Sequence, residues 1–240
     1  FINIIFFKRI YKIKFIWKII MHKTVENLLK IYQKVKVKFE TNNDITKLPN
    51  IIAVSKTFKI DHILPVINYG HLHYGENKVQ EAVEKWTEIK KKNNNLKLHL
   101  IGRLQTNKVK FAVKLFDYIH SLDSKKLADK ICKIQKELKL KRKFFIQVNI
   151  GNENQKSGVL VDGVIEFYKY CKNIDLDIVG LMCIPPFNDD PKKYFKQMKI
   201  LKEKLKLNEL SMGMSSDYLD AIENSATYIR IGSSIFGNRN

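Results

Sequence analysis

Short apolar runs alternate with longer amphipathic segments along most of the chain. The short runs are rich in β-branched residues and predict buried strands, whereas apolar residues at helical spacing predict helices. The predicted strands are residues 51–56, 71–76, 97–102, 118–122, 144–150, 178–184, 210–214 and 228–232. The predicted helices between them are residues 61–69, 77–92, 107–115, 125–140, 161–173, 191–206 and 217–223.

This alternation predicts an α/β fold with a parallel sheet, and eight strands favour closure as a single (β/α)8 TIM barrel. The length of 240 residues suits one such domain, which typically needs about 200–250 residues. An open, doubly wound sheet is the alternative, but it usually stops at about five or six strands. Apolar residues at helical spacing over residues 21–39 predict an extra N-terminal helix. We therefore expect residues 21–240 to form one barrel domain.

Residues 1–20 are apolar but contain five Lys or Arg residues. A bilayer span needs about 20 mostly uncharged residues, so we do not expect a transmembrane helix here. The segment is either a basic amphipathic leader or surface helix, or an extension of the sequence ahead of a true start at Met21. We favour the extension.

The net charge of +20 raises nucleic acid as a partner. However, 39 of the 44 basic residues are lysines, whereas groove and phosphate recognition favours arginine. The lysines are also spread along helix-like segments such as 125–143, which is typical of solvated helix faces. We expect no nucleic-acid partner, although a basic module that binds nucleic acid or a membrane surface stays open as an alternative.

The cysteine and histidine spacings predict no metal site. Cys132, Cys171 and Cys183 are widely separated, which is typical of free thiols in a reducing compartment. His71 and His73 would lie on one face of a strand, but no further ligands stand at a suitable local spacing.

Lys56 ends the apolar run 51–54 and is flanked by two hydroxyl residues. In a barrel, functional residues gather at the carboxyl ends of the strands, which is where this lysine would lie. Apolar surroundings lower the pKa of an amine and favour Schiff-base chemistry. Taken alone, however, a lysine at a strand end is more often a solvated boundary charge.

Small and hydroxyl residues follow the last two predicted strands. Gly213 and Ser215 follow strand 210–214, and Gly232 and Ser233 follow strand 228–232. Backbone amides at these two positions of a barrel commonly bind a phosphate, and glycine allows close approach. The alternative is that they are ordinary loops.

Arg230 shares a strand face with Tyr228 and Gly232 and lies between two isoleucines. If that face is the barrel interior, a charge is buried there and requires a partner. The alternative is an outward arginine that pairs with a carboxylate on a helix.

Seven sequence blocks, in order, resemble those of the pyridoxal phosphate homeostasis protein family. The similarity extends from about residue 25 to residue 239. The blocks are residues 53–57, 74–81, 99–108, 148–149 with 156–158, 180–185, 210–215 with 217, and 230–237.

The resemblance implies a single-domain barrel akin to the barrel domain of alanine racemase, with pyridoxal 5′-phosphate (PLP) as the cofactor. Lys56 would hold PLP as a Schiff base, Ser215, Gly232 and Ser233 would hold the phosphate, and Arg230 would face the pyridine nitrogen. Position 233 is more often threonine in the family, and serine keeps the hydroxyl. The implied cofactor-binding residues are Lys56, Asn77, Ser215, Arg230, Gly232 and Ser233.

Such a site is expected to bind the cofactor without catalytic turnover. An arginine does not give up its proton, so the ring nitrogen beside it stays unprotonated and is a poor electron sink. Racemisation also needs acid and base groups on both faces of the substrate. In the racemases a further β-domain supplies the second base, and we expect none here because only three residues follow Gly237.

We therefore expect a non-enzymatic protein of intracellular vitamin B6 homeostasis that buffers PLP or delivers it to PLP-dependent apo-enzymes. The alternative is a PLP-dependent amino acid racemase or lyase of low activity. We expect a monomer in the cytoplasm, or in an organelle if residues 1–20 are a genuine leader.

Overall fold

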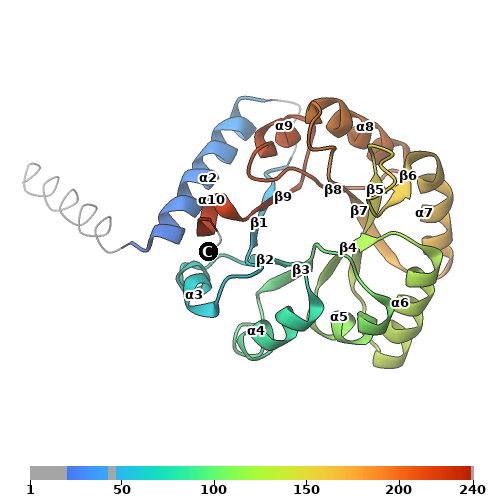
Figure 1. The fold of residues 1–240 in the computed structure, drawn as a ribbon, viewed down its shortest axis with the longest axis horizontal. Helices are drawn as coiled ribbons and strands as arrows, with labels where there is room; N and C mark the ends of the chain where they lie inside the picture. Colours follow the sequence, from blue (N-terminus) through green and yellow to red (C-terminus); the bar gives the residue numbers. More distant parts are fainter. Residues whose placement is uncertain (1–20, 43–46, 239–240) are drawn as a thin grey trace, which may run out of the picture.

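The computed structural model describes residues 21–42 and 47–238 of the chain. Within this part, eight strands form a closed barrel in which every neighbouring pair is parallel, in the order β4-β3-β2-β1-β9-β8-β7-β5, closed by β4–β5 (Figure 1). The predicted eight-stranded parallel barrel is thus confirmed. Its strands are β1 (Asn50–Val54), β2 (His73–Glu76), β3 (Lys97–Leu100), β4 (Tyr118–Leu122), β5 (Lys143–Asn149), β7 (Asp177–Cys183), β8 (Glu209–Ser211) and β9 (Tyr228–Ile231).

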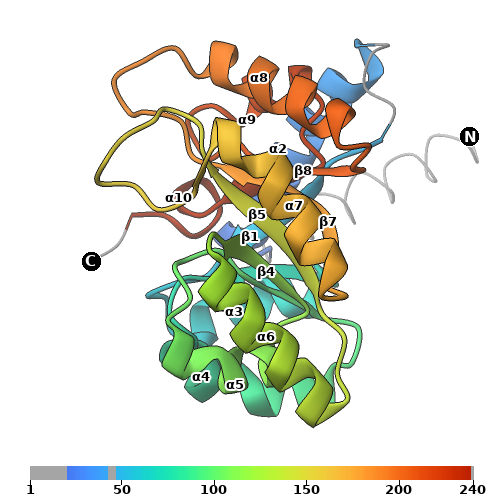
Figure 2. The same cartoon turned by 90° about the vertical axis from the view of Figure 1, so that its right-hand side faces the viewer.

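A ring of helices covers the outside of the barrel (Figures 1 and 2). Seven of its helices match the predicted ones to within a few residues. They are α3 (Ile60–Asn68), α4 (Val79–Lys92), α5 (Val109–Leu115), α6 (Lys125–Leu138), α7 (Val164–Asn173), α8 (Pro191–Lys204) and α9 (Tyr218–Glu223).

The predicted N-terminal helix, α2 (Lys23–Glu40), completes this ring between α3 and α9 (Figure 1). The last strand is followed by the short helix α10 (Ser233–Phe236). Asn27 Nδ2 of α2 donates to the Ile235 carbonyl of α10 at 3.0 Å. Because α2 buries apolar residues such as Leu28 there, it takes the place of the eighth barrel helix.

The core has two parts, one between strands and helices and one inside the barrel. Ile52 and Val54 of β1 face the barrel interior with Phe145 and Tyr228, whereas Ile51 belongs to the outer part. Burial on both faces explains why strands of a parallel barrel are continuous apolar runs rather than alternating ones.

Several short elements were not predicted because they are too short to carry a periodic pattern. The two-residue strand β6 (Val159–Leu160) pairs with the end of β5. The predicted helices at 107 and 161 begin as the 3-10 turns η1 (Thr106–Lys108) and η2 (Val161–Gly163).

The prediction that His71 and His73 share a strand face is wrong. His71 precedes β2, because the chain enters the strand only at His73, and its Nδ1 lies 2.9 Å from the hydroxyl of Tyr32 on α2. His73 contacts His99, with Nδ1 and Nε2 2.9 Å apart.

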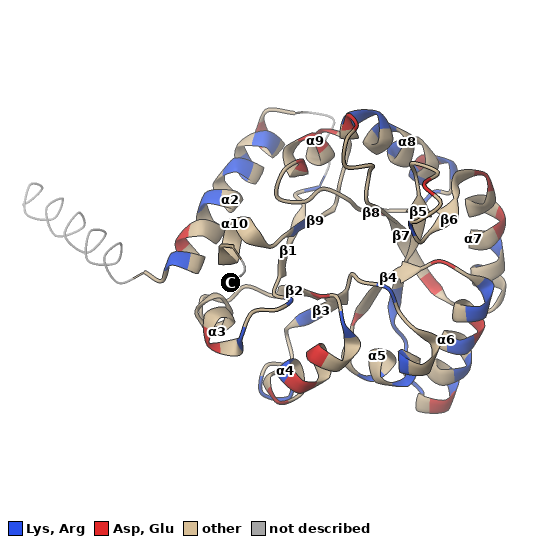
Figure 3. Cartoon of the chain, viewed as in Figure 1, with Lys and Arg blue, Asp and Glu red and all other residues tan. Residues whose placement is uncertain are grey.

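Lys and Arg residues lie mainly on the outer helices, including α2, α6 and α8 (Figure 3). This distribution agrees with solvated helix faces. A membrane-crossing helix would need a longer apolar stretch than any helix in the described part of the chain provides. The predictions for residues 1–20 lie outside the described residues.

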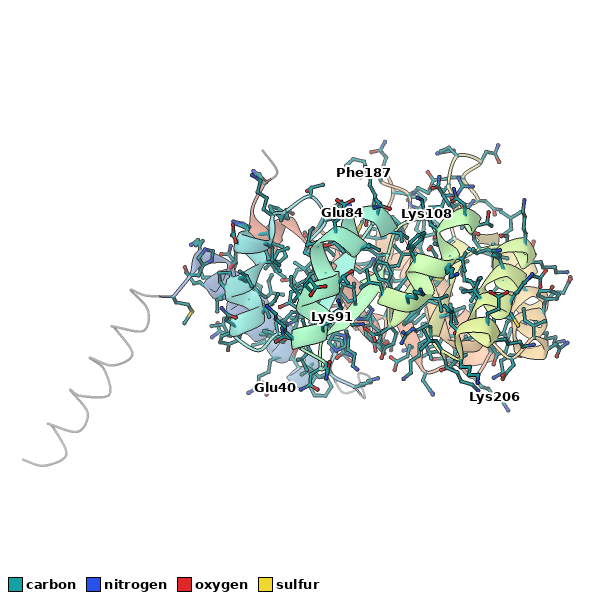
Figure 4. The ribbon with its side chains drawn as sticks, turned by 90° about the horizontal axis from the view of Figure 1, so that it is seen from below. Glu40, Glu84, Lys91, Lys108, Phe187 and Lys206 are labelled. Carbon is teal, nitrogen blue, oxygen red and sulfur yellow. The ribbon has the colours of Figure 1, made fainter. Side chains whose placement is uncertain are left out.

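The loops that follow the strands and those that precede them lie at opposite ends of the barrel. In Figure 4, Phe187, in the loop after β7, lies at one edge of the molecule. Glu40 at the end of α2 and Lys206 before β8 lie at the other edge.

Candidate functional site

A cavity of about 680 Å³ opens at the carboxyl ends of the strands. All six residues predicted to bind the cofactor line it, namely Lys56, Asn77, Ser215, Arg230, Gly232 and Ser233. The remaining lining residues, which the sequence analysis did not assign, are Val54, Phe58, Ile101, Ile184, Met214, Ser216, Gly237 and Asn238.

The strand order explains why these residues meet. β1 lies between β2 and β9, and β9 lies next to β8. In register, Ala53 of β1 is opposite Ile231 of β9, and Val54 is opposite Gly75 of β2. Because parallel strands end on the same side, the residues just beyond these four strands converge on one cavity.

The backbone on both sides of Lys56 is held in place. Ser55 Oγ donates to the Glu76 carboxylate at 2.8 Å, and the Thr57 amide donates to the Glu81 carboxylate at 2.6 Å. Thr57 has φ of 69°, which costs a β-branched residue about 1–3 kcal/mol of strain. The chain turns sharply immediately after the lysine, which fixes where its side chain begins.

Glu76 supports this turn from a fully buried position. Besides Ser55, its Oε1 accepts from Lys85 Nζ at 3.0 Å and from the Trp86 indole at 2.9 Å. Burial raises the pKa of the Glu76 carboxyl above its ordinary value. Glu76 was not predicted to have a role, although an acid that ends a buried strand is a recognisable signal.

Gly213 and Gly232, which were predicted to allow close approach of a phosphate, differ in how much space surrounds them. Gly213 has φ of 87°, and a Cβ there would lie 2.6 Å from Ala221 Cβ and 2.9 Å from Tyr218 Cα. It is therefore required for packing against α9, and it does not line the cavity. At Gly232 a Cβ would meet Val54 no closer than 3.5 Å, an ordinary contact, so packing does not demand glycine there.

The hydroxyls near Gly232 come from two segments, the loop after β8 and the first residue of α10. Ser233 Oγ donates to Ser215 Oγ at 3.3 Å. The two serines follow the neighbouring strands β9 and β8. They place two hydroxyl groups, each able to donate or accept, close together in the lining of the cavity.

Arg230 lies inside the barrel, with 4% of its surface exposed. The inward orientation is confirmed, and the outward alternative is wrong. Its Nη1 donates to Ser211 Oγ and its Nη2 to the Cys183 carbonyl, both at 2.8 Å. Burial lowers the pKa of the Arg230 guanidinium, but arginine stays charged in proteins. The buried charge thus has neutral partners and lines the cavity.

Three buried histidines, His71, His99 and His120, and the partly buried His73 make the fold sensitive to acid. Burial lowers the pKa of His71 and of His73 to about 4, and it lowers the pKa of His99 and of His120 well below the ordinary value. In an unfolded chain the pKa of histidine is about 6.5. Below that pH the unfolded chain binds protons that the folded chain does not, so stability falls as the pH falls towards 4.

We therefore expect the free energy of unfolding to drop by up to about 1.4 kcal/mol per pH unit for each histidine in this window. Urea denaturation at neutral pH and at about pH 5 measures the drop. His71→Phe should make the dependence shallower. A free energy of unfolding that is unchanged across this range would contradict the assignment of neutral, buried imidazoles.

Two similarities to known proteins show the class of protein to which this barrel belongs. Residues 35–240 match the sequence model of the family described as "Alanine racemase, N-terminal domain". An alanine racemase structure from Clostridium difficile shares the fold, with 16% identity and a TM-score of 0.68 over 90% of this chain and 57% of that chain.

The chain belongs to the pyridoxal phosphate homeostasis protein family. The relative from Aquifex aeolicus (strain VF5) is 36% identical over 224 residues, covering 89% of this chain and 97% of the relative. The human relative is 37% identical over 212 residues, covering 80% and 77%.

Two solved structures of PipY from Synechococcus elongatus PCC7942 are also similar. The structure without PLP has 33% identity and a TM-score of 0.79 over 90% of this chain and all of PipY. The structure with PLP bound has 31% identity and a TM-score of 0.74 over 89% of this chain and all of PipY.

Proposed function

We propose that this protein binds PLP as a Schiff base on Lys56 and buffers or delivers it in vitamin B6 homeostasis, without catalytic turnover. The observation that carries the proposal is the convergence of all six predicted residues on one cavity at the carboxyl end of the barrel. Membership of the family and the PLP-bound structure of PipY support it.

The residues present fit PLP. The cavity volume lies within the range of about 300–1,000 Å³ that is usual for small-molecule sites. Lys56 offers an amine, and the hydroxyls of Ser215 and Ser233 with the Gly232 backbone offer a phosphate site. Arg230 offers a buried donor for the ring nitrogen. When bound, PLP supplies an aldehyde that condenses with amines and a ring that withdraws electrons.

The cavity favours binding over turnover. Among the described residues that line it, Lys56 and Arg230 are the ionisable ones. Arg230 donates hydrogen bonds but does not release a proton, so of these two only Lys56 can act as a general acid or base. Racemisation needs a second such group on the opposite face of the substrate.

The experiment that tests this role combines two assays on PLP-loaded protein. Incubation with L-alanine and other L-amino acids should give no product beyond the amount of protein present. Mixing with a PLP-free aminotransferase should restore aminotransferase activity as PLP moves across. Sustained multiple turnover of an amino acid would overturn the non-enzymatic role and favour a weak racemase or lyase.

The same proposal covers the proteins that receive PLP, the oligomeric state and the location in the cell. We propose PLP-dependent apo-enzymes as recipients, a monomeric state, and the cytoplasm as the location. Free Cys132, Cys171 and Cys183 support a reducing compartment. Size-exclusion chromatography with light scattering tests the monomer.

Gly232→Ala tests the phosphate site without disturbing the fold. The backbone at Gly232 has φ of −111°, and an added Cβ makes only ordinary contacts with the protein. We expect an unchanged unfolding midpoint and PLP affinity lower by about tenfold, because a methyl group hinders close approach to the phosphate. Equilibrium dialysis measures the affinity.

Gly163→Ala is the matched control. Gly163 lies outside the cavity, and its added Cβ would come no closer than 3.4 Å to a neighbour. PLP affinity should not change in this variant. Equal affinities in the two variants would place the phosphate away from Gly232.

A further inference from the structure

A continuous series of polar side chains crosses the barrel interior and ends at Arg230. His73 Nδ1 lies 2.9 Å from His99 Nε2, and His99 Nδ1 lies 2.9 Å from His120 Nε2. His120 Nδ1 lies 2.9 Å from Ser211 Oγ, which accepts from Arg230 Nη1 at 2.8 Å. These residues come from β2, β3, β4, β8 and β9. The contacts therefore run from the first residue of β2 to the cavity.

Aromatic rings enclose the central histidines and keep them neutral. His99 stacks on Tyr118 with ring centroids 4.5 Å apart, and His120 stacks on Phe145 at 4.2 Å. Both histidines are fully buried, and burial lowers the pKa of each well below its ordinary value. A neutral imidazole has one N–H donor and one acceptor nitrogen. If a neighbour donates to one ring nitrogen, the ring must therefore donate to its next neighbour from the other.

Arg230 determines in which direction the hydrogen bonds between Ser211 and the three histidines are donated. An arginine only donates, so Ser211 Oγ must accept from it and send its own proton elsewhere. Among the described residues, the acceptor that the structure places beside this hydroxyl is His120 Nδ1. His120 then carries its proton on Nε2 and donates to His99 Nδ1. His99 in turn donates from Nε2 to His73 Nδ1.

We propose that Ser211 and His120 are positioning residues for Arg230, and that the three histidines, each protonated on Nε2, form a relay that fixes this direction. Reversing the relay would bring the His120 N–H to Ser211, whose hydroxyl proton would then lack its acceptor. The relay thereby keeps a lone pair of Ser211 directed at Arg230 and holds the guanidinium at the cavity. The effect on PLP rests on the proposed function, whereas the relay itself does not.

The first test uses the ligand-free full chain. Nitrogen-15 NMR of histidine-labelled protein reports which ring nitrogen carries the proton. We expect His73, His99 and His120 all to be protonated on Nε2, with each signal assigned by a single histidine substitution. Protonation of His120 on Nδ1 would overturn the proposal. This measurement stands even if no variant of Ser211 folds.

The second test compares two buried serines on the inner strands. Ser211→Ala removes the hydroxyl between Arg230 and His120. Ser121→Ala is the matched control, because Ser121 is also buried and its hydroxyl has no hydrogen-bond partner among residues 21–42 and 47–238. We expect Ser211→Ala to change the protonated nitrogen of His120, to shift the visible band of PLP-loaded protein, and to weaken PLP binding by about tenfold. Ser121→Ala should leave all three unchanged.

Different results would overturn the proposed PLP-binding function and the proposed positioning role of Ser211 and His120. If wild-type protein does not bind PLP but shows the expected imidazole protonation, the proposed function is wrong and the relay stands. If PLP binds and Ser211→Ala behaves like Ser121→Ala, the positioning role is wrong and the proposed function stands.

Discussion

Replacing Lys56 by alanine is expected to abolish the visible absorption band of PLP-loaded protein completely. In the function proposed above, the band would arise from a Schiff base between Lys56 Nζ and the cofactor, and alanine has no amine to form it. The proposed phosphate and ring contacts of Ser215, Gly232, Ser233 and Arg230 would remain, so weak, noncovalent PLP binding should persist. Absorption spectra before and after dialysis separate the two modes.

Lys59→Ala is the matched control for this substitution. Lys59 lies three residues further along the chain and is exposed, and it does not line the cavity. The band should be as strong in this variant as in the wild-type protein. A band retained by Lys56→Ala would show that another of the many lysines holds the cofactor.

Replacing Gly102 by alanine is expected to damage both the fold and the site. An added Cβ would lie 2.3 Å from the Asn77 carbonyl oxygen and 2.8 Å from Asn77 Cα. These are backbone atoms, which cannot swing aside as a flexible side chain can. We expect the free energy of unfolding to fall by about 3 kcal/mol and PLP affinity to fall as Asn77 moves.

Chemical denaturation measures the stability of Gly102→Ala, with Gly163→Ala as the control. Both substitutions add one methyl group, but only the first meets backbone at short range. Loss of stability without loss of PLP affinity would mean that the Asn77 backbone does not help to form the site. Equal stability of the two variants would contradict the close contact of Gly102 with Asn77.

The barrel was predictable because strand-like and helix-like segments alternate eight times, and because strands such as β1 carry a continuous apolar run that the helices do not. Residues 51–54 are buried on both faces, so the run itself identifies an inner strand. Short elements such as β6 and α10 carry no period and were missed. His71 was misplaced because periodicity cannot show where the chain enters a strand.

The site was only partly predictable. Strand alternation put Arg230 on one face with Tyr228 and Gly232 but left open whether that face is the interior. The rule that parallel strands end on one side predicted Lys56 at the functional end of the barrel. The partners of Arg230 were not predictable, because Ser211 and the Cys183 carbonyl lie on β8 and β7, and the sequence does not show the order and register of these strands beside β9. His73, His99 and His120 are more than 20 positions apart in sequence, and no local pattern connects them.

The most direct test of Lys56 as the cofactor lysine is reduction of PLP-loaded protein with borohydride, followed by peptide mass spectrometry. Reduction converts a Schiff base to a stable amine and so marks the lysine that held PLP. We predict a single pyridoxyl group, located on Lys56. A pyridoxyl group on another lysine, or none on Lys56, would contradict the assignment of this site.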